Sequence, residues 1–178
     1  MRKVVAYELL SLDGVAESPD EFFHEWDDVM GENLARVIAT QDTVLLGRRT
    51  YDEWADFWPT SDIEPFATFI NAVEKFVATS TTPELSWTNS TVIDGNLVET
   101  VTDLKNRPGG DFGLHGSVEL TRALLDSGLV DELRLVIAPA LQVRGRRLFE
   151  EGTPRRLTLV RHDASPTGYL LLDYLVGS

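Results

Sequence analysis

Two short segments of the sequence place a glycine and a hydroxyl residue where a strand is expected to run into a helix. In the first, Leu46 is followed by Gly47, Arg48, Arg49 and Thr50. Glycine lets the backbone approach a ligand closely, and the arginines add positive charge. A helix start also presents unpaired N–H groups and the positive end of the helix dipole, which favour phosphate. An ordinary glycine turn before a capped helix fits the same residues, so this segment alone indicates either a phosphate site or a plain turn.

The second segment, LHGSVEL, repeats this order around Gly116 and Ser117 before another expected helix. It lacks the full G-x-G-x-x-G fingerprint of dinucleotide sites, so on its own it is a weak signal. Parallel sheets bind ligands beyond the carboxyl ends of their strands, where both segments would lie. A dinucleotide carries a pyrophosphate and, in some cases, a further ribose phosphate. The two segments together therefore predict a site for such a cofactor.

A third group of hydroxyls, Thr79 and Ser80, follows an expected strand at residues 76–78. These side chains could hold a ribose or its phosphate. A Ser/Thr turn before Pro83 explains them equally well, and both interpretations stay open.

Composition limits the class of protein. The chain has 178 residues and a formal net charge of -13, which suits one domain over residues 1–178 and argues against a nucleic-acid binder. The absence of cysteine excludes disulfides, thiolate zinc sites and Fe–S clusters. No cluster has metal-ligand spacing, so we predict no metal. The apolar N-terminal stretch is too short for a signal peptide or a membrane span, so we expect a cytoplasmic protein with no membrane partner.

The elements that must position these residues alternate between strands and helices. Apolar, β-branched runs predict strands at residues 4–10, 43–46, 76–78, 91–93, 111–114 and 132–138. Helical spacing predicts helices at 31–40, from Thr50 (with a Thr50/Glu53 capping box), at 98–106 and from Ser117 to Gly128. The tail, to residue 176, predicts a hairpin that turns at 166–168. These elements predict an α/β fold with a mostly parallel sheet and an antiparallel C-terminal hairpin. Because the hairpin is long and apolar, we also predict a homodimer that covers it.

Five motifs occur in an order that resembles a known family: SLDG, LLGRRTYDEW, NAVEKFVATST, LHGSVELTRALLDSGLVDEL and GRRLF. The chain resembles the dihydrofolate reductase-like superfamily over nearly its whole length. It is most similar to the C-terminal reductase domain of riboflavin-biosynthesis deaminase-reductases and its stand-alone bacterial relatives. The resemblance implies a three-layer α/β fold, NADPH as hydride donor and, usually, a homodimer. We expect no deaminase half within these residues, because zinc deaminases need a cysteine pair and the sequence has no cysteine.

The resemblance also implies roles for individual residues. The implied cofactor-binding residues are Gly14, Gly47, Arg48, Thr50, Thr79, Ser80, Gly116, Ser117, Val118 and Glu119. Those near Gly47 would contact the ribose phosphate and pyrophosphate, Thr79 and Ser80 the adenosine ribose, and residues 116–119 the pyrophosphate. Two positions depart from the pattern. Relatives often carry arginine in place of Ser80, so Arg48 is the compensating candidate for a 2′-phosphate, and relatives tend to have glycine in place of Val143.

Hydride transfer to a C=N or C=O bond needs a proton donor, and the resemblance points to an acid at the start of the first helix. Glu32 and Asp13 are the candidate catalytic residues. Glu32 could instead complement the helix dipole, and Asp13 could form a turn before Gly14. Trp26, Tyr51 and Trp54 are candidate substrate-binding residues that could stack on a flat heterocycle. Each could also be a core residue.

We therefore predict an NADPH-dependent reductase that transfers a hydride to a small heterocyclic or imine/carbonyl substrate, pterin- or pyrimidine-like. The alternative is a non-catalytic or degenerate nucleotide-, pterin- or flavin-binding protein of the same fold. An authentic dihydrofolate reductase is a third possibility, and we expect weak or no activity on dihydrofolate.

Overall fold

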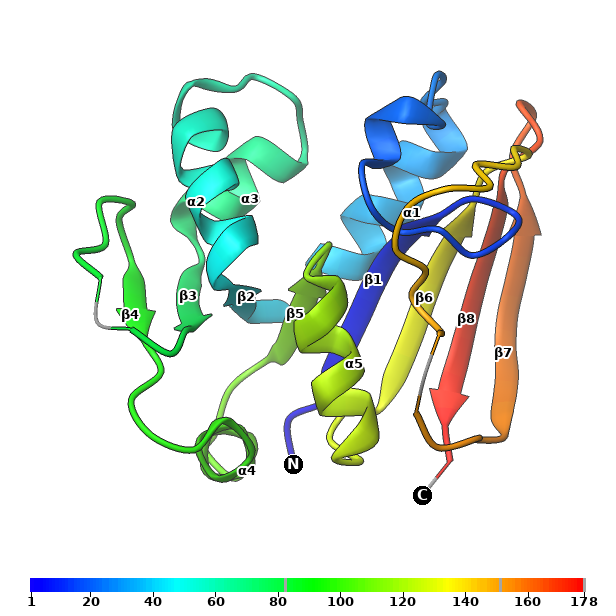
Figure 1. The fold of residues 1–178 in the computed structure, drawn as a ribbon. Helices are drawn as coiled ribbons and strands as arrows, with labels where there is room; N and C mark the ends of the chain where they lie inside the picture. Colours follow the sequence, from blue (N-terminus) through cyan, green and yellow to red (C-terminus); the bar gives the residue numbers. More distant parts are fainter. Residues whose placement is uncertain (82, 151, 178) are drawn as a thin grey trace.

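A computed structural model describes residues 1–81, 83–150 and 152–177. In these ranges the strands form one eight-stranded sheet with the order β4-β3-β2-β5-β1-β6-β8-β7 (Figure 1). The strands are β1 Val4–Leu10, β2 Gln41–Gly47, β3 Glu74–Ala78, β4 Ser90–Val92, β5 Asp111–His115, β6 Glu132–Ile137, β7 Leu157–Ala164 and β8 Leu170–Val176. The strands β1 to β6 pair in parallel, whereas β8 pairs antiparallel with β6 and β7. The predicted mostly parallel sheet with an antiparallel C-terminal hairpin is confirmed.

The helices cover both faces of this sheet and give three layers (Figure 1). They are α1 Asp28–Ile38, α2 Arg48–Phe57, α3 Phe66–Ala72, α4 Leu97–Lys105 and α5 Val118–Asp126. One apolar core joins one sheet face to α1 and α3, with Val37 and Ile70 fully buried. A second core joins the other face to α4 and α5, with Val101 and Leu124 fully buried. None of the helices in the described ranges has the length and apolar character that a membrane span requires.

The central strand β1 shows why the sheet is buried on both faces. Val4 and Ala6 pack in the core with α4 and α5, whereas Tyr7 packs in the core with α1 and α3. Near-continuous apolar runs of this kind are typical of parallel strands covered by helices on both sides. Because β2, β5 and β1 lie side by side in parallel, their carboxyl ends meet at one edge of the sheet.

One local prediction was wrong. The helix α2 begins at Arg48 after Gly47, so Thr50 lies inside the first turn and no side chain caps this helix. The predicted Thr50/Glu53 capping box does not form, because the helix starts two residues earlier. The helix α3, which begins just after Pro65, was not predicted from the sequence. It is short, and Glu64, just before it, stabilises its start by accepting hydrogen bonds from Thr68.

Candidate cofactor site

The two glycine-containing segments lie next to each other at the carboxyl edge of the sheet. Leu45 of β2 is the register partner of Leu114 of β5, so both strands end at the same level. The backbone N–H of Gly47 donates a hydrogen bond to Ser117 Oγ at 3.0 Å. The helices α2 and α5 start immediately after these two residues, near the centre of Figure 1. The sheet thus brings two helix N-termini together.

These two helix starts differ from those of α1 and α4. The side chain of Asp27 caps α1 and that of Asn96 caps α4, each accepting hydrogen bonds from first-turn N–H groups. Neither α2 nor α5 has a side-chain cap, since Gly47 carries no side chain and the Ser117 hydroxyl accepts from Gly47 instead. Unpaired N–H groups at a helix start attract an anion, and here two such starts adjoin. Such a pair of helix starts can hold an anionic group.

The polar residues after β3 lie beside the start of α2. Arg48 Nη1 is 3.5 Å from Thr81 Oγ1, and its Nε donates to both carboxylate oxygens of Asp52 at 2.8 and 2.7 Å. Thr79 Oγ1 accepts a hydrogen bond from the Thr81 N–H at 3.2 Å, and Ser80 is exposed in the same turn. The structure therefore brings the three candidate residues for a ribose phosphate, Arg48, Thr79 and Ser80, into one corner of the edge.

Asp13 is a fixed carboxylate at the end of β1. It accepts hydrogen bonds from Ser11 Oγ at 2.7 Å and from the backbone N–H groups of Gln142 and Val143 at 2.9 Å each. These bonds lower the pKa of Asp13 to about 2, with the Ser11 bond as the largest cause. A group that stays ionised at neutral pH is a poor proton donor, so its geometry favours an anchoring role over the catalytic one.

The segment that Asp13 holds is strained. Val143 has a φ of 65°, in the left-handed region that β-branched residues rarely adopt. The backbone therefore keeps a conformation that glycine adopts without strain, and the N–H of Val143 bonds to Asp13. Gly14, at a φ of 84°, accepts a hydrogen bond from the Leu148 N–H. Gly14 thus joins the 142–148 segment to the end of β1.

Glu32 is exposed on α1, on the side away from the buried Met30, Leu34 and Val37. Within the described residues no hydrogen bond or ion pair links Glu32 to Asp13, and the role of Glu32 as proton donor stays a prediction.

Of the three predicted substrate-stacking aromatics, Trp54 lies at the glycine junctions. A Cβ built on Gly116 would be 3.6 Å from Trp54 Cζ2. Tyr51 is 3% exposed, and its hydroxyl accepts a hydrogen bond from the Trp87 N–H, so it is a core residue and that prediction was wrong. Trp26 is 45% exposed near the start of α1, beside Gly31.

Buried titratable groups near the site were missed by the sequence reasoning. Glu8 is 1% exposed on β1 and accepts a hydrogen bond from Thr121 Oγ1 at 2.8 Å. Burial raises its pKa to about 7. His115 is also buried, within hydrogen-bond distance of Gln41, and burial lowers its pKa to about 3, so it is neutral. The sequence could have indicated a buried carboxyl here, because Glu8 is the one charged residue in the apolar strand β1.

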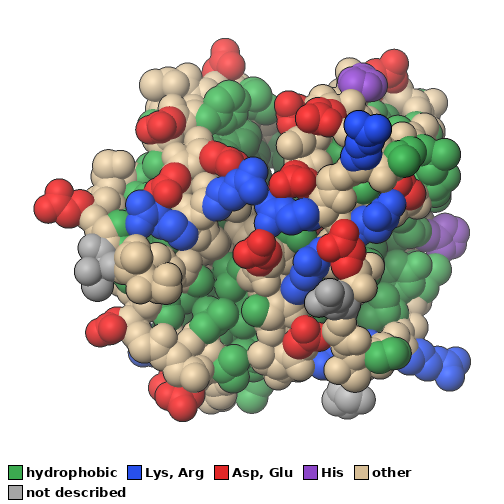
Figure 2. Space-filling view, viewed as in Figure 1, with side chains coloured by type: hydrophobic (Ala, Val, Ile, Leu, Met, Phe, Trp, Pro, Cys, Tyr) green, Lys and Arg blue, Asp and Glu red, His purple; other side chains and the backbone are tan. Residues whose placement is uncertain are grey.

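A chain of ion pairs beside the start of α5 was also missed. Arg146 bonds to Glu17 and Glu119, and Glu17 also contacts Arg49. Figure 2 shows basic and acidic side chains alternating across the middle of this face. The Gly-Arg-Arg run of the last motif was the available signal. The contact between Glu17 and Arg146 joins residues 129 positions apart, which the sequence alone does not reveal.

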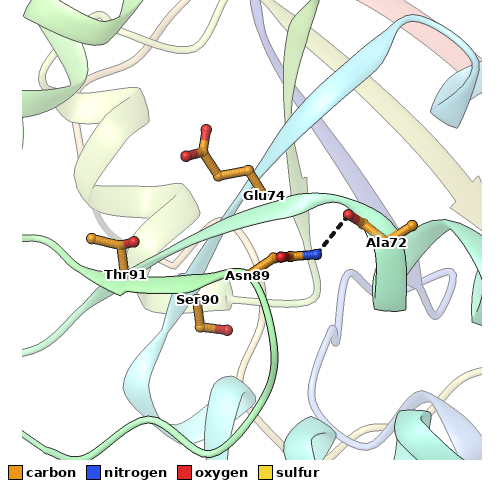
Figure 3. Close-up of a pocket in the computed structure, with 5 residues that line it drawn as sticks. All are labelled: Ala72, Glu74, Asn89, Ser90 and Thr91. Atoms are coloured by element: carbon orange, nitrogen blue, oxygen red, sulfur yellow. Dashed lines mark hydrogen bonds between the residues drawn. The ribbon is translucent and has the colours of Figure 1, made fainter.

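A separate surface pocket of about 410 Å³ lies at the opposite edge of the sheet. Figure 3 shows residues from the starts of β3 and β4 around it, with Asn89 donating to the Ala72 carbonyl at 3.0 Å. Parallel α/β sheets bind ligands at the carboxyl edge, so this pocket is not the candidate site. Within the described ranges no three His, Asp or Glu side chains group as metal ligands, and the metal-free site stays a prediction.

The chain has one mostly parallel sheet between two layers of helices, and the sheet ends in an antiparallel hairpin. This is a dihydrofolate reductase-like fold. More narrowly, the chain belongs to the RibD C-terminal domain family, whose model matches residues 2–171.

One curated relative and several solved structures are similar to this chain. The uncharacterized Bacillus subtilis protein YyaP is 32% identical over 138 residues, which are 75% of this chain and 73% of YyaP. A putative riboflavin biosynthesis protein from Shewanella sp. PV-4 has the same fold, with a TM-score of 0.81, 18% identity and 99% of each chain covered. A bifunctional deaminase/5-amino-6-(5-phosphoribosylamino)uracil reductase from Thermotoga maritima has a TM-score of 0.70 at 13% identity, with 99% of this chain but 57% of that chain covered.

Proposed function

We propose that this protein is an NADPH-dependent reductase that transfers a hydride to a small heterocyclic or imine/carbonyl substrate, pterin- or pyrimidine-like. The observation that carries the proposal is the pair of uncapped helix starts joined by the Gly47–Ser117 hydrogen bond. Membership in the RibD C-terminal domain family supports a reductase role in riboflavin biosynthesis. A solved Corynebacterium diphtheriae relative is named a pyrimidine reductase-like protein, which supports the substrate class.

The residues at the carboxyl edge fit NADPH in this proposal. The first-turn N–H groups of α2 and α5 hold the pyrophosphate, including those of Val118 and Glu119. Arg48 contacts the ribose 2′-phosphate beside Thr79 and Ser80, because its guanidinium already lies within reach of that turn. The bound cofactor supplies the hydride.

The substrate lies against Trp54, whose ring borders Gly116 and contacts Phe66, with 5.6 Å between the ring centroids. A flat heterocycle gains stacking energy and exclusion of water from such a surface. Water supplies the proton in this proposal, because Asp13 stays ionised and Glu32 faces solvent.

One observation favours the second candidate, a binding protein without turnover. Asp13, the predicted proton donor at the end of β1, stays ionised and is not a neutral acid. Loss of NADPH absorbance is the discriminating assay, with pterins, pyrimidines and ribityl-aminopyrimidines as substrates and dihydrofolate as a comparison.

Calorimetric titration with NADPH, and with NADH in parallel, comes before that screen. We expect selective NADPH binding followed by substrate-dependent oxidation. Binding without oxidation across the panel would favour the binding protein. No binding of either dinucleotide would overturn the cofactor assignment.

A further inference from the structure

Arg146 has two carboxylate partners of very different exposure beside the start of α5. Its Nε donates to Glu17 Oε1 at 3.0 Å, and its Nη1 donates to Glu119 Oε1 at 2.6 Å. The backbone N–H of Arg146 also donates to Glu17 Oε2 at 3.2 Å. The Glu17 side chain is 27% exposed and that of Glu119 is 77% exposed. Glu17 is therefore a fixed anchor, whereas Glu119 is held by one ion pair and is free to rotate into solvent.

The position of Glu119 creates an electrostatic conflict with an anionic ligand. It lies in the first turn of α5, whose N-terminus has no side-chain cap. A phosphate at this helix start would meet the negative charges of both Glu119 and Glu17. Like charges within a few ångströms oppose binding unless a cation compensates. Arg146 is the cation that bonds to both.

We propose that Arg146 is a further cofactor-binding residue of this site, which exchanges the Glu119 carboxylate for the pyrophosphate of the cofactor while Glu17 keeps it in position. Without cofactor, the Glu119 carboxylate pairs with the Arg146 guanidinium. The pyrophosphate of the cofactor displaces this carboxylate when it binds. The inference rests on the proposed function, since it assumes a dinucleotide at the two helix starts. It adds a basic residue from the β6–β7 connection to a site otherwise built from α2, α5 and the turn after β3.

The two residues should act on affinity in opposite directions. Arg146→Met removes the phosphate contact, leaves Glu119 without its Arg146 partner and leaves Glu17 with Arg49 alone, so NADPH should bind at least about tenfold more weakly. Glu119→Gln removes the competing anion, so NADPH should bind about two- to fivefold more tightly.

The chain offers matched controls for both variants. Arg144 is exposed in the same connection and has no ion pair in the described structure, so Arg144→Met should leave NADPH affinity unchanged. Glu99 occupies the first turn of α4, a helix capped by Asn96, so Glu99→Gln should also have no effect.

The experiment is calorimetric titration of wild type and the four variants with NADPH, with circular dichroism to establish that each variant is folded. Weaker binding by Arg146→Met together with tighter binding by Glu119→Gln would support the proposal. Unchanged or weaker binding by Glu119→Gln would overturn it, and this variant alters only an exposed side chain. Equal affinities of Arg146→Met and Arg144→Met would overturn it as well. Failure of wild type to bind NADPH would instead overturn the proposed function.

Discussion

The buried carboxyl of Glu8 should make the stability of this protein depend on pH. Glu8 is 1% exposed on the central strand β1, and its one hydrogen bond in the described structure comes from Thr121. Burial disfavours the charged form and raises the pKa of Glu8 from 4.5 to about 7. The folded protein therefore holds a proton that the unfolded chain releases between about pH 4.5 and 7.

The sign and size of the effect follow from this difference. Stability supplied by the protonated form is complete below pH 4.5 and is lost as the pH rises through about 7. Each tenfold change in an ionisation equilibrium corresponds to about 1.4 kcal/mol, so the loss at pH 8 is about 3 kcal/mol. Glu8→Gln stays neutral at every pH and keeps an oxygen that accepts from Thr121. Because about 0.8 kcal/mol of this loss has already occurred at pH 5, the variant should gain about 2.5 kcal/mol relative to wild type between pH 5 and pH 8.

Urea unfolding at pH 5 and pH 8, followed by circular dichroism, measures this difference directly. Comparing the two proteins at each pH cancels the contributions of all other titrating groups. Glu32→Gln is the control, because Glu32 is exposed on α1, and its difference from wild type should stay within about 0.5 kcal/mol. The reasoning is refuted if the Glu8→Gln advantage is the same at both pH values, since Glu8 would then be charged or neutral in both states alike.

Three further predictions concern the cofactor, the core and the assembly. Arg48→Ala should weaken NADPH binding about tenfold and NADH binding little, with the exposed Arg107→Ala as control, and equal weakening would remove Arg48 from the 2′-phosphate role. Tyr51→Phe leaves the buried Trp87 N–H without its acceptor and should lower the free energy of unfolding by about 1–2 kcal/mol. Tyr174→Phe is the control, and an unchanged free energy of unfolding for Tyr51→Phe would show that water replaces the lost hydrogen bond. The hairpin exposes Leu159 and Leu170, so light scattering at micromolar protein should give the mass of two chains, and a monomer mass would contradict the homodimer.

The inner parallel strands could be predicted because β1, β2 and β5 are short apolar runs that burial on both faces explains. The starts of α2 and α5 could be located from the glycines at 47 and 116. The order of the strands could not be predicted, because it depends on contacts between distant parts of the chain. The helix α3 could not be predicted either, because a helix of this length shows too little periodicity in the sequence.

Within the site, local motifs were informative and long-range contacts were not. The residues Arg48, Thr79 and Ser80 were predicted together and lie together. Asp13 was predicted to be a catalytic residue. The hydrogen bond that favours an anchoring role instead comes from Val143, 130 positions away in the sequence. Such contacts depend on how the chain returns to the sheet edge, which spacing along the sequence does not encode.

The hydrogen bond between Gly47 and Ser117 has a consequence for folding, because it joins residues 70 positions apart. The paired helix starts cannot exist until β2 and β5 are adjacent, and β5 also needs β1 beside it. Parallel pairings of this separation form slowly, so the site is completed late in folding. A dinucleotide that binds there would recognise only the finished molecule. The bound dinucleotide would slow unfolding and raise the population of the native state, but it would not increase the rate of folding.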